Sequence, residues 1–142
     1  LNIRSNYRTV LSAVVLMLLL HRRPEMKLYI AILDEFPDYM VPTLVAHAVL
    51  GAHLKFSERY ISPEFQCWEY PLYMDWLENS FKKCVVRVNQ KEFDKITALP
   101  NVYLGHENNT LDGRESCAVV CPREETPNVL KFAKLWKPTN ES

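Results

Sequence analysis

The sequence predicts a single α/β domain over residues 26–138, with a four-stranded mixed sheet flanked by helices and preceded by a helical N-terminal extension. Short runs rich in β-branched and aromatic residues alternate with longer segments of helical periodicity, which is the pattern of strands joined by helical crossovers. A segment dense in turn-forming residues separates the last two strand-like runs and indicates a hairpin. The 142 residues, 48% of them apolar, suffice for one core but not for two independent domains.

The first half of the domain is predicted to hold two strands and two helices. The run from Lys27 to Leu33 reads as a buried strand, and a helix from about Val41 to Phe56 follows with Pro42 in its first turn. Small residues in this helix would let it lie close against a sheet: Ala46, Ala48, Gly51 and Ala52. A short second helix begins near Pro71, and the valine-rich run from Lys83 to Val88 is expected to be a central strand.

The second half begins with a helix and continues with the hairpin. Asn89 followed by Glu92 predicts a capping box at the start of this helix, which ends before Pro100. The segment from Asn101 to His106 is a short strand, and the turn-forming sequence ENNTLDG leads from it into the strand ESCAVVC.

A last helix is predicted over TPNVLKFAKLW, before a tail at residues 139–142. Thr126 suits its N-cap, and Pro127 suits its first helical position. Four apolar residues would share one face of this helix: Val129, Leu130, Ala133 and Trp136.

The charge and cysteine content constrain the partners. Lys plus Arg and Asp plus Glu both number 17, but residues 1–25 hold four arginines and one acidic residue, Glu25. The remainder therefore has 13 basic and 16 acidic residues, a formal charge of about −3. A tRNA-binding domain is usually basic. The four cysteines lack the spacing of a zinc site, and Cys117 and Cys121, about 13 Å apart on one strand, could not bridge. We read all four as reduced thiols, which favours a cytoplasmic location, and we expect no metal or cofactor.

Residues 1–25 form an apolar and basic extension. The apolar run from Thr9 to Leu20 is shorter than the roughly twenty residues that span a bilayer, and a basic cluster replaces the cleavage site of a signal peptide. Three interpretations stay open. The native start is Met26 and the extension is upstream translated sequence, or the extension is a membrane-anchoring helix, or it packs on the domain or on a partner.

Three local patterns, in this order and spacing, resemble the type-2 peptidyl-tRNA hydrolases over most of residues 26–138. The sequence KLYIAILDE followed by VPTLVAHAVLGA is similar to the family's first strand and its Ala-rich helix with a histidine, here His47. VYLGHENNT stands where the family has a short motif, which consists of aspartate, alanine, glycine, any residue and threonine in that order. SCAVVCPREETPNVLKFAKLW is similar to the family's last strand and closing helix, with Cys121-Pro122 at its glycine-proline step. The resemblance implies the fold of these enzymes and hydrolysis of the ester that joins a peptide to tRNA.

The resemblance also carries over individual positions. Aligning Thr110 with the family threonine places His106 at the family's acidic residue and Ser116 at a later threonine. Glu35, Asp38 and Met40 stand where lysines are expected, and Leu44 replaces a glutamine. The replaced lysines matter because phosphate contacts supply much of the affinity for nucleic acid.

The candidate catalytic residues are His106, Thr110, Ser116 and His47. A histidine suits a general base because its pKa lies near the working pH. For each residue a structural interpretation stays open beside the catalytic one. The loop from Gly105 to Gly113 could be only a hydrogen-bonded hairpin, and His47 could be a packing residue. His47 and His53 lie about 120° apart around the helix, which argues against a shared metal ion.

Other features also allow two interpretations. Glu35 and Asp38 could bind a cation or a basic partner, or they could belong to a solvated acidic loop. A group of aromatic residues could stack nucleic-acid bases or form a satellite core: Trp68, Tyr70, Tyr73 and Trp76. Lys131, Lys134 and Lys137 could meet RNA or form a solvated basic face.

Three functions remain open at this point. The first is a peptidyl-tRNA-hydrolase-like protein that acts on an ester of tRNA or a related substrate. The alternative is a non-catalytic module of the same fold that binds a small molecule or a protein. The third is an anchored accessory protein, which depends wholly on residues 1–25. The partners left open are tRNA and a second copy of the chain in a homodimer, and membrane contact depends on residues 1–25 being an anchor.

Overall fold

A computed structural model describes residues 12–14, 16, 25–61, 70–108 and 111–139 of the chain. The N-terminal extension therefore lies largely outside the described residues, as do Cys67, Trp68 and Thr110. No helix within the described ranges is long and apolar enough to cross a membrane.

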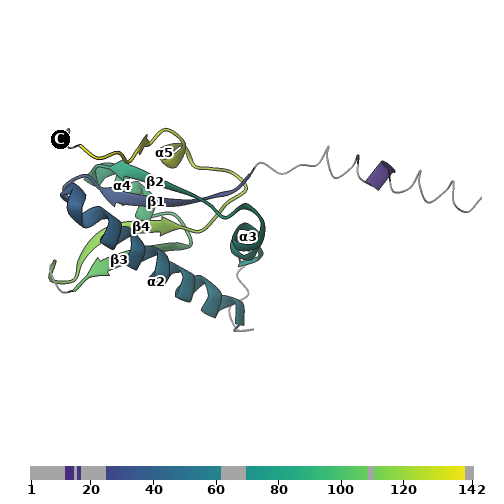
Figure 1. The fold of residues 1–142 in the computed structure, drawn as a ribbon, viewed down its shortest axis with the longest axis horizontal. Helices are drawn as coiled ribbons and strands as arrows, with labels where there is room; N and C mark the ends of the chain where they lie inside the picture. The colour runs from purple at the N-terminus through teal and green to yellow at the C-terminus, as the bar shows by residue number, and fades with distance from the viewer. Residues whose placement is uncertain (1–11, 15, 17–24, 62–69, 109–110, 140–142) are drawn as a thin grey trace, which may run out of the picture.

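The described domain is α/β, with a five-stranded mixed sheet in the order β3-β4-β1-β2-β5 (Figure 1). Its strands are β1 (Lys27–Leu33), β2 (Lys82–Val88), β3 (Val102–Glu107), β4 (Arg114–Val120) and β5 (Lys134–Leu135). β1 pairs with β2 in parallel, and the other three pairings are antiparallel. The four predicted strands and the β3–β4 hairpin are confirmed, whereas β5 was not predicted.

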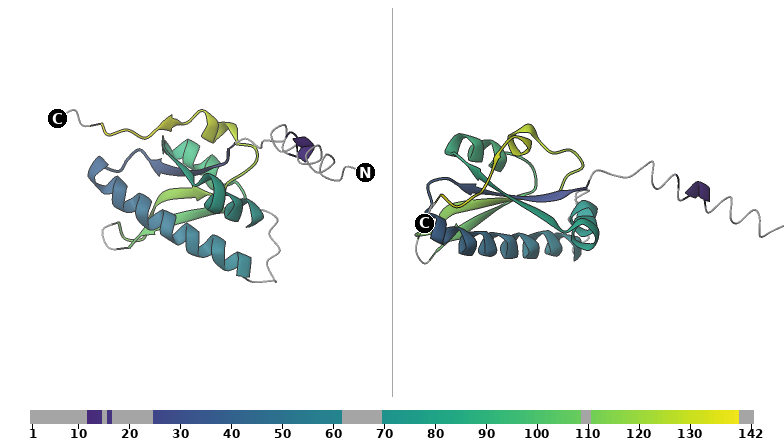
Figure 2. Two further views of the ribbon diagram at one scale, coloured as in Figure 1. Left: turned by 45° about the vertical axis from the view of Figure 1, so that its right-hand side comes forward. Right: turned by 45° about the horizontal axis from the view of Figure 1, so that its top comes forward.

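Helices cover both faces of the sheet. The elements are η1 (Asp38–Met40), α2 (Val41–Ile61), α3 (Tyr70–Asp75) with its continuation η2 (Trp76–Ser80), α4 (Gln90–Thr97) and α5 (Asn128–Lys131). Figure 2 shows α2 along one face and α4 with α5 on the other. The crossover from β1 through α2 and α3 to β2 keeps these two strands parallel, as the alternation of patterns predicts.

α2 lies close to β3 because small residues meet at the contact. A Cβ atom added to Gly105 of β3 would lie 2.9 Å from the Cβ of Ala48, and one added to Gly51 of α2 would lie 2.2 Å from the hydroxyl of Tyr103. The prediction that small residues bring this helix onto a sheet is confirmed at Ala48 and Gly51. Ala46 is exposed and takes no part.

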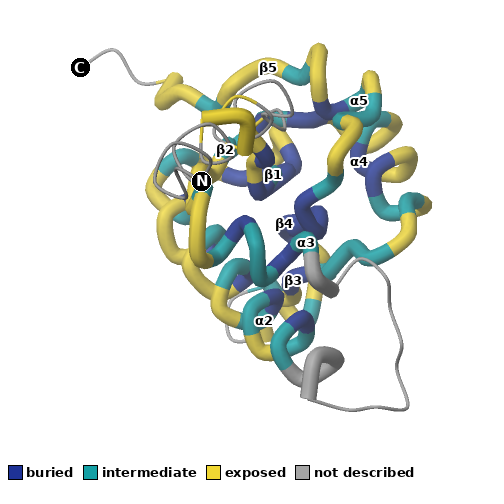
Figure 3. The backbone as a smooth tube through the Cα atoms, turned by 90° about the vertical axis from the view of Figure 1, so that its right-hand side faces the viewer, coloured by how far each residue is buried: buried dark blue, intermediate teal, exposed yellow. Residues whose placement is uncertain are grey.

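The core fills the space between the sheet and its helices, as the buried segments in Figure 3 show. Tyr73 and Trp76 are buried members of this core and pack with Phe56 of α2, with ring centroids 5.1 Å apart for Phe56 and Tyr73 and 5.5 Å apart for Tyr73 and Trp76. The His53 ring and the Tyr73 hydroxyl form a 2.7 Å hydrogen bond. Tyr73 and Trp76 are therefore packing residues, as one interpretation predicted, but they belong to the main core rather than to a satellite core.

The start of α4 follows its prediction in detail. The side chain of Asn89 accepts a hydrogen bond from the backbone N–H of Glu92 at 2.9 Å, and the Glu92 carboxylate accepts one from the backbone N–H of Asn89 at 3.0 Å. This is the expected capping box. The described cysteines Cys84, Cys117 and Cys121 are free thiols, as predicted.

The predicted closing helix is wrong over most of its length. α5 is a single turn with Pro127 at its N-cap, and no side chain caps it, so Thr126 is not the cap. The chain then becomes extended, pairs as β5 with Val86 and Arg87, and places the backbone N–H of Trp136 2.9 Å from the carbonyl of Val85. The open edge of β2 offers these hydrogen bonds, which outweigh the local helical preference of the sequence.

Candidate functional site

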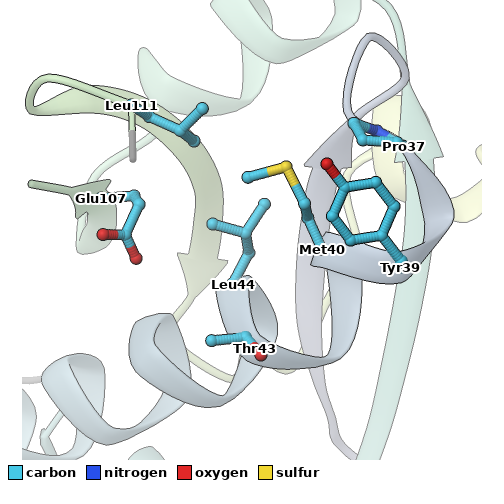
Figure 4. Close-up of a pocket in the computed structure, with 7 residues that line it drawn as sticks. All are labelled: Pro37, Tyr39, Met40, Thr43, Leu44, Glu107 and Leu111. Carbon is cyan, nitrogen blue, oxygen red and sulfur yellow. The ribbon is translucent and has the colours of Figure 1, made fainter. Parts of the chain in front are cut away.

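A pocket of about 540 Å³ lies between the start of α2 and the end of β3 (Figure 4). Most of its wall is apolar, and its lining residues are Pro37, Tyr39, Met40, Thr43, Leu44, Glu107 and Leu111. η1 and the first turn of α2 supply two lining residues each, Pro37 precedes η1, β3 supplies Glu107, and the β3–β4 hairpin supplies Leu111. The pocket therefore lies where the start of α2 faces the end of β3 and the hairpin after it.

Glu107 is the carboxylate of this pocket. Side chains alternate between the two faces of a strand, and Gly105 faces Ala48 of α2, so Glu107 faces α2 as well. The residue is only 8% exposed, and Figure 4 shows its carboxylate opposite Leu44. A carboxylate so nearly removed from water needs a nearby partner.

His47 supplies a neighbouring imidazole from α2. It lies one helical turn after Thr43, and its Nε2 atom is 3.7 Å from Oε2 of Glu107. The His47 side chain is 60% exposed, whereas that of Glu107 is 10% exposed. The pair therefore connects the pocket wall to solvent. Together, a buried carboxylate and an accessible imidazole can accept a proton and pass it to water.

Arg114 adds a positive charge at this end of the sheet. It is the cross-strand neighbour of Glu107, forms an ion pair with Glu35, and holds its guanidinium 5.4 Å from the centroid of the Phe36 ring. Glu35 therefore pairs with a basic residue of its own chain, while its side chain remains 39% exposed. No group of three or more potential ligand side chains within the described ranges could hold a metal ion.

Asp38 belongs to a separate cluster that fastens the end of the chain to η1. Its carboxylate accepts hydrogen bonds from the backbone N–H of Thr139 and, at 2.8 Å, from the Thr139 hydroxyl. Arg87 of β2 lies 3.1 Å from the same carboxylate and donates to the carbonyl of Lys137 at 2.8 Å. The bonds from Thr139, with a smaller contribution from Arg87, lower the pKa of Asp38. Neither interpretation predicted for Asp38 foresaw this role.

The structure does not bring the three described catalytic candidates, His47, His106 and Ser116, together in one site. His47 adjoins the pocket, but His106 points to the opposite face of β3 from Glu107, where its Nδ1 atom lies 3.0 Å from the carbonyl of Gly113. Ser116 is buried, and its hydroxyl donates to the carbonyl of Gly105 at 3.4 Å. Thr110 lies outside the described residues. His106 and His47 therefore do not share the pocket.

Glu107 was missed by the sequence reasoning, although a signal for it exists. In the strand VYLGHE, Gly105 is the residue small enough to meet an Ala-rich helix, so the positions that alternate with it face that helix. This alternation places Glu107 on the face of β3 that meets α2 and His106 on the opposite face.

Two of the described cysteines, Cys84 and Cys117, are poor nucleophiles. Cys117 is fully buried, and burial raises the pKa of its thiol to about 12. Burial also raises the pKa of Cys84. Because the thiolate is the reactive form, both thiols are inert near neutral pH.

Comparison with protein-family models gives no family that matches the chain. Comparison with curated protein sequences gives no match either.

Proposed function

We propose that the chain is a peptidyl-tRNA-hydrolase-like protein, which hydrolyses the ester of peptidyl-tRNA or a related acyl ester in the pocket beside Glu107. The observation that carries the proposal is the pairing of Glu107 and His47, 3.7 Å apart, at the wall of a pocket of about 540 Å³. Ester hydrolysis needs a base that takes a proton from water, and this pair is an acid–base couple with access to both pocket and solvent.

The finer fold belongs to the same proposal. The three stretches that resemble type-2 peptidyl-tRNA hydrolases lie in β1 with α2, in β3 and in the chain from β4 to β5. Their strands belong to one sheet, and α2 packs on it, which supports a type-2 fold with an added edge strand. The free thiols of Cys84, Cys117 and Cys121 support a cytoplasmic location.

The chemical roles follow from exposure. Glu107 takes a proton from water as the water oxygen attacks the ester carbonyl. When the tetrahedral intermediate collapses, the C–O bond to the ribose breaks and Glu107 returns this proton to the leaving ribose oxygen, while the carboxylic acid that forms loses its own proton to solvent through His47 on the open side of the pair. Thr43 and Tyr39 line the same pocket, and each carries a hydroxyl group of the kind that can donate to a developing oxyanion. His47 also offsets the negative charge of Glu107 when its imidazole is protonated.

The test is release of an N-blocked amino acid from charged tRNA by the wild type and by matched variants. Glu107→Gln keeps the shape of the side chain and removes the base, so kcat should fall by about 100- to 10,000-fold. Glu115→Gln makes the same change at an exposed position on the neighbouring strand and should leave kcat within twofold of the wild type.

Two outcomes would overturn this assignment. Wild-type turnover no faster than buffer would end the proposal of an enzyme. Loss of turnover in His106→Ala with full activity in Glu107→Gln would move the base to the other face of β3.

The second candidate function is a non-catalytic module that binds a small molecule. The composition of the pocket favours it, because none of the seven lining residues is a lysine or arginine that could hold a phosphate of tRNA. An apolar pocket with few polar groups is also typical of a small-molecule site. Saturable binding of a small ligand without turnover would favour this candidate.

A further inference from the structure

We infer that the pocket beside Glu107 accepts an uncharged apolar group carrying an amide, so that the acyl side of the ester is an apolar residue. That the bound group belongs to an ester rests on the proposed function. The chemical class of the group that the pocket binds follows from the pocket itself.

The walls of the pocket select against polar groups. Pro37, Met40, Leu44 and Leu111 surround most of the space, and Leu44 is only 3% exposed. A polar side chain placed among them would lose its hydrogen bonds to water without gaining others, which costs free energy. An apolar side chain of similar size would instead gain from burial.

The volume fits one amino-acid residue with its flanking peptide groups. About 540 Å³ lies in the range of roughly 300 to 1,000 Å³ that is usual for small-molecule sites. In Figure 4, Leu111 and Glu107 lie on one side of the space, Tyr39 and Pro37 on the other, and Leu44 and Met40 between them. A branched aliphatic side chain can contact Met40 and Leu44 while its backbone amide lies toward Glu107.

The charge of the pocket sets the polarity of the attached group. Glu107 is the carboxylate among the lining residues, and it is almost fully removed from water. It would accept a hydrogen bond from an amide N–H of the acyl residue and would repel a second carboxylate. The pocket should therefore favour an N-blocked apolar residue and reject an acidic one.

The experiment compares two probes of nearly equal shape. The wild-type chain is titrated with N-acetyl-leucinamide and with N-acetyl-asparaginamide, and binding is followed by the backbone amide signals of the protein in NMR spectra. We expect leucinamide to bind at least tenfold more tightly, with the largest shifts at Thr43 and Leu111 of the pocket.

Variants locate the binding. Met40→Gln preserves side-chain length and introduces a polar group into the wall, so it should weaken leucinamide binding at least threefold. Leu111→Asn also places a polar group in the wall. It serves as the second variant if Met40→Gln does not keep the wild-type melting temperature. Phe132→Gln makes a comparable change at a residue that is 76% exposed on the other side of the sheet, and it should leave the affinity unchanged.

The outcomes separate this inference from the proposed function. Equal affinity for the two probes, or shifts confined to residues outside the pocket, would overturn the inference. Turnover of leucyl and asparaginyl esters at equal rates would also overturn it while leaving hydrolysis intact. Selective binding of leucinamide without turnover of any ester would uphold the apolar pocket and overturn the hydrolase.

Discussion

Gly105 is the residue on which the approach of β3 to α2 depends most directly. A Cβ atom at this position would lie 2.9 Å from the Cβ of Ala48, and neither backbone can move without shifting a packed element. The same approach places Glu107 beside His47. The glycine is therefore tied to the site as well as to the fold.

Gly105→Ala should destabilise the domain by about 1 to 3 kcal/mol, because the added methyl group overpacks the contact with α2. Chemical denaturation followed by circular dichroism measures the difference. In the background of Ala48→Gly the same substitution should cost less, since the opposing methyl group is gone. An equal loss of unfolding free energy in both backgrounds would show that residues 105 and 48 are not in contact.

Asp38 should make the unfolding free energy of the domain depend on pH in the acidic range. Its pKa is lowered in the folded state, so its contribution is present above the unfolded pKa and is lost as the pH falls through the folded value. The difference in unfolding free energy between the wild type and Asp38→Asn should be constant from pH 5 to 7 and shrink below about pH 4.

Thr139→Val provides the matched comparison for this prediction. It keeps the backbone N–H that bonds to Asp38 and removes the hydroxyl. The difference in unfolding free energy between the wild type and Thr139→Val should therefore change less with pH than the difference between the wild type and Asp38→Asn. A difference between wild type and Asp38→Asn that does not change between pH 2 and 7 would contradict the lowered pKa.

The elements divide into those that local sequence determines and those that it does not. The capping box of α4 involves residues three apart, and the signal for the β3–β4 hairpin, the turn-forming sequence ENNTLDG, is equally local, so both could be predicted. β5 is different. The sequence KFAKLW has a helical preference, and only the open edge of β2, far away in the chain, makes it extended.

The cap of α4 yields a test at this scale. Asn89→Ala should destabilise the domain by about 0.5 to 2 kcal/mol, because the backbone N–H of Glu92 loses its partner. Lys91→Ala, at an exposed position in the first turn of the same helix, is the control and should change stability by less than about 0.5 kcal/mol. Thermal or urea unfolding measures the stability of both variants. Equal changes in unfolding free energy for Asn89→Ala and Lys91→Ala would mean that the cap contributes little to stability.

At the scale of the whole molecule, the sequence was enough to predict an α/β domain, because alternating hydrophobic periods recur along the chain. It could not assign the site. The ion pairs of Arg114 with Glu35 and of Arg87 with Asp38 join distant segments, and the choice between His106 and Glu107 depends on which face of β3 meets α2. Such choices are made by packing in three dimensions.

The central claim is that α2 and β3 bring His47 and Glu107 together as one functional unit. It is tested most directly by kcat/KM for ester hydrolysis in the wild type, His47→Ala, Glu107→Gln and the double variant. We expect the double variant to lose little more than Glu107→Gln alone, because groups that act together are not additive. Losses that multiply, or a Glu107→Gln variant as active as the wild type, would contradict the claim.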